Sequence, residues 1–179
     1  MASPRNTILY IAASLDGFIA PPDDSLDWLS AVAREGEDYG YFSFYETVDT
    51  LIVGRRTYDI ASRFEGGFPH AKKECYVITS KPQPAQGSVQ FYSGDLRALV
   101  ASLKSHEGGT IFIDGGAGVV NSMLKDDLID EFVISTIPVL LGSGIRLFGE
   151  DNPKLPLRLV SSKAYESGLV QSRYQRVRG

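Results

Sequence analysis

Short apolar runs alternate with amphipathic segments along the chain up to residue 137. The runs of strand length occupy residues 8–13, 50–53, 75–79, 89–92, 110–113 and 131–137. Between most of them, apolar residues recur at helical spacing, in the segments 38–48, 57–63, 96–103 and 119–124. Apolar strands separated by helices predict a mainly parallel sheet with helices on both faces.

The last part of the chain follows a different pattern. Residues 157–165 and 169–177 have strand character and flank Glu166-Ser167-Gly168, a combination that is typical of a hairpin. We therefore expect an antiparallel edge on the parallel sheet. Because no repeat or linker interrupts the pattern, the sequence predicts a single α/β domain over residues 1–179.

Two of the expected helices carry recognisable end signals. Asp95 can cap the helix at 96–103, and Gly108 can end it. Ser25 or Asp27 can cap a short helix that follows them. These residues set the helix boundaries that the sequence predicts.

A long loop is expected at residues 14–27. Asp16-Gly17 supplies the turn chemistry that ends the first strand, and Pro21-Pro22 can continue neither a helix nor a strand. Because the loop is long and starts at a strand end, we expect it to be mobile without ligand and more ordered with ligand bound. A rigid, compact loop is the alternative.

Composition excludes several classes of partner. The chain has 22 acidic and 18 basic residues, so its net charge of −4 lacks the positive field that nucleic-acid binding normally requires. Its apolar runs are far shorter than the roughly 20 residues that span a bilayer, and the N-terminus lacks a signal-peptide layout. The single Cys75 has no partner for an internal disulfide, which suits a reducing compartment. We expect a cytoplasmic protein without nucleic-acid or membrane partners.

A glycine-rich segment is the first candidate for binding chemistry. Asp114-Gly115-Gly116-Ala117-Gly118 lies between a strand and a helix, where backbone N–H groups can approach a phosphate. The Rossmann spacing fails, because Asn121 stands where the third glycine would be, and no P-loop lysine follows. The alternative is a tight turn that only lets helix and strand pack.

Two further polar segments follow predicted strands. Gly54-Arg55-Arg56-Thr57 comes after the strand at 50–53, and Thr79-Ser80-Lys81 ends the strand at 75–79. Paired arginines at the carboxyl end of a strand suit a phosphate monoester. Surface arginines held in salt bridges are the alternative interpretation.

A carboxylate is the candidate for acid–base work. Asp38 stands four residues before Phe42 and seven before Tyr45, so we expect the three to share a helix face. Apolar surroundings would raise the Asp38 pKa and make it a possible proton donor, whereas an acid that only starts a helix is the alternative. His70 and His106 are expected at the surface, and no zinc-ligand spacing or G-x-S-x-G elbow occurs.

The order of the motifs is familiar as a whole. The chain reads SLDGFIA, DTLIVGRRTYD, YVITS, IFIDGGAGVVNSML, LIDEFVISTIPVLLGSGIRLF and YESGLVQSRYQRV. It resembles the dihydrofolate reductase-like superfamily, above all the reductase domain of bacterial riboflavin biosynthesis and its free-standing relatives. The resemblance covers residues 8–177 and implies that superfamily's three-layer α/β fold. Relatives in the riboflavin branch are usually paired, which implies a homodimer.

The resemblance also implies a nicotinamide cofactor, NADPH. The turn at 54–57 and the segment 79–81 would hold its 2′-phosphate, residues 115–119 its pyrophosphate, and residues 12–19 its nicotinamide. The cofactor residues implied are Ala12, Ala13, Ile19, Gly54, Arg55, Arg56, Thr57, Thr79, Ser80, Lys81, Asp114, Gly115, Gly116, Ala117, Gly118 and Val119.

For the substrate, the resemblance leaves two types open. Asp38 falls where dihydrofolate reductases carry a carboxylate that assists pterin protonation, whereas IPVLLGSG follows the branch that reduces a ribosylaminopyrimidine phosphate. The substrate residues expected are Trp28, Asp38, Phe42 and Tyr58, with Asp38 catalytic. The chain is thus expected to be an NADPH-dependent reductase of a small heterocycle. The alternative is a nucleotide-binding or regulatory protein that keeps the cofactor cleft without turnover.

Overall fold

The computed structural model describes residues 5–178, which form ten strands and five helices. The strands are β1 (Thr7–Ser14), β2 (Phe18–Ala20), β3 (Val48–Gly54), β4 (Glu74–Ile78), β5 (Val89–Tyr92), β6 (Thr110–Gly115), β7 (Glu131–Ile137), β8 (Ile145–Arg146), β9 (Leu157–Ala164) and β10 (Val170–Arg176). The helices are the 3₁₀ helix η1 (Asp27–Val32) and the α-helices α1 (Tyr41–Glu46), α2 (Arg55–Ala61), α3 (Leu96–Lys104) and α4 (Ala117–Lys125).

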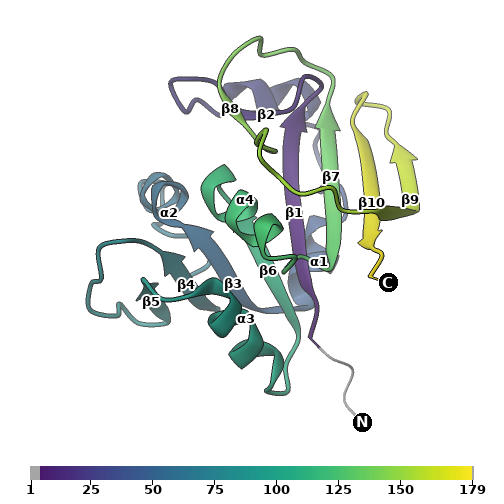
Figure 1. Ribbon diagram of the computed structural model, residues 1–179. Coiled ribbons are helices and arrows are strands. Elements are labelled where there is room, and N and C mark those ends of the chain that lie inside the picture. Colours follow the sequence, from purple (N-terminus) through teal and green to yellow (C-terminus); the bar gives the residue numbers. More distant parts are fainter. Residues whose placement is uncertain (1–4, 179) are drawn as a thin grey trace.

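Eight of the strands form one sheet in the order β5-β4-β3-β6-β1-β7-β10-β9 (Figure 1). Neighbouring strands from β5 to β7 run parallel, and β10 pairs antiparallel with both β7 and β9. This confirms the predicted α/β fold with a mainly parallel sheet and an antiparallel hairpin at its edge. The carboxyl ends of β1, β3, β4 and β6 lie at the same end of the sheet.

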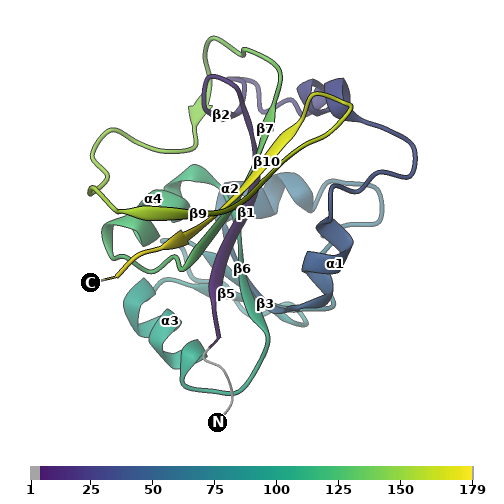
Figure 2. The same cartoon turned by 90° about the vertical axis from the view of Figure 1, so that its right-hand side faces the viewer.

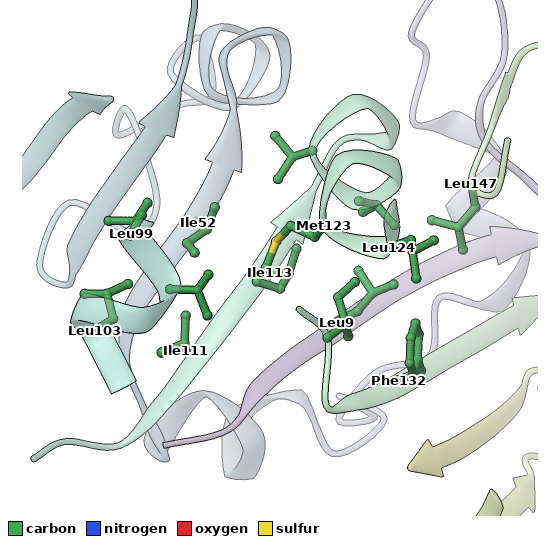
Figure 3. Packing of buried hydrophobic residues seen from close by; sticks show 14 of the residues in the cluster. Leu9, Ile52, Leu99, Leu103, Ile111, Ile113, Met123, Leu124, Phe132 and Leu147 are labelled. Carbon is green, nitrogen blue, oxygen red and sulfur yellow. The ribbon is translucent and has the colours of Figure 1, made fainter. Parts of the chain in front are cut away.

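Side chains of the central strands alternate between two apolar clusters on opposite faces. Ile52 and Ile113 pack with α3 and α4, whereas Leu51 and Phe112 pack with aromatic residues of α1 and α2. Figure 2 shows α3 and α4 on one side of the sheet and α1 on the other, and Figure 3 shows the cluster beneath α3 and α4. Each fully buried Leu or Ile contributes about 1.5–3 kcal/mol of hydrophobic stabilisation, which holds the strand ends in fixed positions.

The predicted helix ends are partly right. The Asp95 side chain accepts a hydrogen bond of 3.0 Å from the backbone N–H of Ala98, so the predicted cap of α3 is confirmed. The helix ends at Lys104, with Ser105 as its C-cap, rather than at Gly108. At η1 the cap is Leu26, which provides no side-chain hydrogen bond, so the expected caps Ser25 and Asp27 are wrong. The Ser25 hydroxyl instead accepts from the N–H of Asp27 in a local turn (3.2 Å).

The expected loop at 14–27 contains a strand. Residues of β2 pair antiparallel with β8, and the Asp16 carboxylate ties the preceding turn to the chain before β8. It accepts hydrogen bonds from the Ser14 hydroxyl (2.6 Å) and from the N–H groups of Leu141 (3.1 Å) and Gly142 (2.7 Å). The bond from Ser14 and those from the backbone lower the Asp16 pKa to about 2. The first half of the segment is thereby anchored.

Candidate functional site

A cleft of about 950 Å³ lies at the carboxyl ends of the parallel strands, where α2 and α4 begin. The end of a strand and the start of the next helix are where α/β sheets usually bind ligands. Fourteen residues expected from the sequence line this cleft: Ala12, Ile19, Trp28, Gly54, Arg55, Arg56, Thr57, Thr79, Ser80, Asp114, Gly116, Ala117, Gly118 and Val119. Ala13, Gly115 and Lys81 do not line it.

Glycines bring two of the strand ends into direct contact. A Cβ atom on Gly116 would lie 2.9 Å from Thr57 Oγ1, and one on Gly54 would lie 3.3 Å from Val119 Cγ2. Side chains at these positions would push the β3–α2 and β6–α4 turns apart. The packing role that the sequence suggested for this turn therefore applies, and the approach of a phosphate to its backbone stays a prediction.

The helices that begin at these turns present free N–H groups to the cleft. Neither α2, which is capped by Gly54, nor α4, which is capped by Gly116, has a side-chain cap. The first N–H groups of a helix have no partner within the helix and carry partial positive charge. Residues Ala117, Gly118 and Val119 of the first turn of α4 line the cleft, so this wall suits a negatively charged group.

Both arginines after β3 line the cleft and also form ion pairs. Arg55 Nε lies 2.8 Å from an oxygen of Asp59, one turn along α2, and its guanidinium stands 5.5 Å from the centre of the Phe91 ring. Arg56 reaches across to Asp24 in the loop after β2 with a distance of 2.6 Å. The two interpretations of these arginines are compatible, because exposed pairs of this kind are weak and exchange readily.

A different set of side chains forms the wall near β1 and β6. His70 is buried, with Nδ1 3.1 Å from the hydroxyl of Tyr45 and Nε2 3.7 Å from Oδ2 of Asp114. Its ring lies 5.3 Å from Phe68 and 6.1 Å from Phe112 between ring centres. The expectation that His70 is a surface residue is wrong, because the loop that carries it folds back over β6.

Burial moves the pKa values of this wall in opposite directions. It raises the pKa of Asp114 to about 6 and lowers that of His70 to about 4, because loss of water disfavours each charged form. Burial also raises the pKa of Tyr41, which lines the same wall. At neutral pH, Asp114 is mostly ionised while His70 and Tyr41 are neutral.

Comparison with known families agrees with this geometry. The model of the RibD C-terminal domain family matches residues 5–171. The chain belongs to the RibD C-terminal domain family. One solved relative is described as a riboflavin biosynthesis protein.

Individual relatives of this RibD C-terminal domain support the assignment. The uncharacterised protein YwjB of Bacillus subtilis (strain 168) is 48% identical over 173 residues, which cover 96% of this chain and 98% of YwjB. The crystal structure of a putative riboflavin biosynthesis protein from Shewanella sp. PV-4 is 36% identical, with a TM-score of 0.87, 99% of this chain covered and 100% of that chain.

A more distant structure shows the wider fold. Dihydrofolate reductase from Enterococcus faecalis, complexed with NADP(H) and RAB-propyl, is 18% identical, with a TM-score of 0.69, 99% of this chain covered and 100% of that chain. The expected dihydrofolate reductase-like fold is thus confirmed for this RibD C-terminal domain.

Asp38 does not fit the arrangement that its spacing predicted. Tyr39 and Gly40 have φ values of +56° and +80°, so α1 begins only at Tyr41 and Asp38 precedes the helix. The Asp38 carboxylate accepts from the N–H groups of Phe42 (2.8 Å) and Gly40 (3.0 Å). These bonds lower the Asp38 pKa, in contrast to the rise that the sequence suggested.

Of the expected substrate residues, only Trp28 lines the cleft. Asp38, Phe42 and Tyr58 do not line the cleft. Phe42 is 67% exposed, and Tyr58 packs edge-on between the rings of Phe68 and Phe91. Trp28 does line the cleft, and its buried Nε1 has no hydrogen-bond partner among residues 5–178.

Among residues 5–178, no three His, Cys, Asp or Glu side chains come together as metal ligands.

Sequence reasoning missed one pair of side chains in the cleft, the acid Asp114 and the histidine His70. These two residues are 44 positions apart in the sequence. Nothing in the local pattern around His70 signals that contact, whereas Asp114 was found through its glycine-rich context.

Proposed function

We propose that this protein is an NADPH-dependent reductase that acts on a small heterocyclic substrate. The observation that carries the proposal is the composition of the cleft of about 950 Å³ at the strand ends. One wall offers free helix N–H groups and two guanidiniums, and the other offers aromatic rings and a carboxyl group. Membership of a riboflavin-pathway, reductase-like family supports this proposal.

The polar wall fits a nicotinamide dinucleotide in the order that the motifs suggested. The first turn of α4 would hold the pyrophosphate, because its glycine start lets the backbone approach closely. Arg55, Arg56 and the hydroxyls of Thr79 and Ser80 would hold the 2′-phosphate at the ends of β3 and β4. Ala12 and Ile19 would flank the nicotinamide, which when bound supplies the hydride.

The protein itself would supply orientation and a proton. Asp114 lies on the aromatic wall with a pKa raised to about 6, so it exchanges protons readily near neutral pH. The low pKa of Asp38 and its place outside the cleft favour Asp114 over Asp38 for this role. We assign the proton-handling carboxyl to Asp114 and no catalytic task to Asp38.

Two features bear on the cellular location of the protein. The single cysteine, Cys75, is buried in β4, and burial raises its pKa to about 12, so it stays a thiol. Among residues 5–178, no helix has the length and apolar character to cross a membrane. We propose a cytoplasmic location.

Oxidation of NADPH tests the reductase proposal. Absorbance at 340 nm is followed with the protein, NADPH and a panel of pterin and aminopyrimidine substrates. We expect turnover of at least one substrate and its loss in Asp114→Asn. Binding of NADPH without turnover on any substrate would favour a nucleotide-binding or regulatory protein instead.

A further inference from the structure

Asn121 lies in the second turn of α4, and its side chain makes four hydrogen bonds. Its Nδ2 donates to the carbonyl oxygens of Ala117 (2.6 Å) and Leu147 (3.0 Å). Its Oδ1 accepts from the N–H of Gly149 (2.7 Å) and from the side-chain amide of Asn152. A side-chain amide has two donors and two acceptor positions, so this one is fully used. The side chain therefore ties α4 to the chain segment 147–152.

The bond to Leu147 continues into the strand pair β2–β8. Leu147 directly follows β8, which pairs with β2. The Leu147 N–H donates to the carbonyl oxygen of Gly17 (3.0 Å), and its side chain is buried in the apolar cluster beneath α4 (Figure 3). This one residue thus connects Asn121 to the strand from which Ile19 and Ala20 line the cleft.

The two elements that Asn121 joins face the cleft at different places. Ala117, Gly118 and Val119 line it from the first turn of α4, after β6, whereas Ile19 lines it from β2. The strands β2 and β8 have only three and two residues, so their own pairing holds them weakly. Their place relative to α4 therefore depends on contacts such as the one through Asn121, which does not itself line the cleft.

We infer that Asn121 is a positioning residue for the cofactor, which keeps the pyrophosphate site at the start of α4 and the nicotinamide site beside Ile19 at a fixed spacing. The inference rests on the proposed reductase function. Because the two halves of a dinucleotide are covalently joined, both contribute to affinity only when the protein holds their sites at the matching spacing. Loss of the tie should weaken the contribution of the nicotinamide half and spare that of the adenosine half.

Calorimetric titration with NADPH and with adenosine 2′,5′-bisphosphate separates the two halves. The second compound has the adenosine, the 2′-phosphate and the 5′-phosphate but no nicotinamide. For Asn121→Ala we expect NADPH to bind about tenfold more weakly and the bisphosphate to bind as in the unmodified protein, to within about twofold. The ratio of the two affinities is the decisive quantity, because partial unfolding would reduce both affinities by the same factor.

Two further variants show which bond of Asn121 matters. Asn121→Asp keeps an acceptor for Gly149 but cannot donate to Leu147, so it should lower the ratio as Asn121→Ala does. It also carries the test if Asn121→Ala does not fold. The matched control Asn152→Ala removes a partner of the same amide without touching Leu147 and should leave the ratio unchanged.

The inference and the proposed function fail by different results. A ratio that is unchanged or raised in the Asn121 variants, or lowered to the same extent in Asn152→Ala, would overturn the inference while the reductase proposal stands. If the unmodified protein does not bind NADPH, the reductase proposal is wrong and the inference falls with it.

Discussion

The ionised side chain of Asp114 lowers the free energy of unfolding. Burial raises its pKa to about 6, so the folded protein holds this proton more tightly than the unfolded chain does. The resulting penalty is absent at low pH, grows as the pH rises through the interval from the unfolded to the folded pKa, and persists above it. The proton-handling role that we propose for this carboxyl therefore comes at the expense of stability.

Replacing this carboxyl tests the sign of the effect. We expect Asp114→Asn to match wild type near pH 4 and to be more stable by about 1–3 kcal/mol at pH 7, because the amide cannot ionise. Urea unfolding at several pH values measures the difference, with Asp151→Asn as the control. A variant that is less stable than wild type at pH 7 would contradict the assignment of this pKa.

We propose that Arg55 and Arg56 determine the choice of cofactor. Charge-assisted hydrogen bonds to the 2′-phosphate contribute roughly 1.5–3 kcal/mol each, so each arginine removed should weaken NADPH binding by about ten- to hundredfold. NADH binding should barely change, and the preference for NADPH should weaken with rising salt.

Dissociation constants for both cofactors check this prediction. They are measured for Arg55→Ala, for Arg56→Ala and for the double variant. The control Arg97→Ala removes an exposed, ion-paired arginine that does not line the cleft. Equal losses for NADPH and NADH, or no loss of either, would show that the arginines are structural.

Single residues also show what sequence reasoning could reach. Arg55, Thr79 and Gly116 were found because each directly follows or ends a strand, so their place depends on local pattern alone. His70 was misplaced because its burial depends on a loop that packs against β6. The expected place of Asp38 on the face of α1 is wrong because two left-handed residues delay the start of that helix, which spacing alone does not reveal.

At the scale of elements, the long periodic segments were predictable and the short ones were not. Strands such as β1 and β6 are apolar on both faces because helices cover them. The strands β2 and β8 have three and two residues, too few for any period, and form only because the chain brings them together. The Asp16 side chain holds the turn before β2 against the segment before β8 through hydrogen bonds from Leu141 and Gly142.

Amide exchange tests the role of Asp16. We expect Asp16→Asn to speed exchange at Leu141 and Gly142 by about tenfold, because each N–H loses a bond to a charged acceptor. Asp23→Asn, which alters an exposed local turn, is the control. Unchanged exchange at both amides would contradict the anchoring.

The part of the 14–27 segment that follows β2 is where we expect NADPH binding to change the mobility of the chain. Asp24 pairs with Arg56, so a cofactor phosphate that engages Arg56 would exchange partners with this loop. We expect NADPH to slow amide exchange over residues 14–27, with the larger change beyond β2. Equal protection with and without NADPH would favour the rigid-loop alternative.

At the scale of the whole molecule, the hairpin edge is the most apolar exposed surface among the described strands. All of β9 is exposed, with Leu159 at 54% and Val160 at 52%, and Val170 on β10 is 37% exposed. An uncovered edge strand with apolar side chains invites pairing with another chain. We propose a homodimer through this hairpin.

Light scattering tests the dimer. We expect twice the mass of one chain at micromolar concentration, and a shift toward the single-chain mass in Leu159→Lys, which places a charge on the exposed strand. The single-chain mass for the unmodified protein would remove the proposal and leave the cleft unaffected.

Mapping NADPH onto the backbone by amide chemical shifts tests whether the cofactor binds in this cleft. Binding at the strand ends requires that perturbations gather at three segments that are distant in sequence: residues 54–57, 79–80 and 116–119. We predict saturable shifts at these three segments together and little change along β9. Absence of saturable shifts, or shifts that gather elsewhere on the molecule, would contradict the assignment of this cleft to the cofactor.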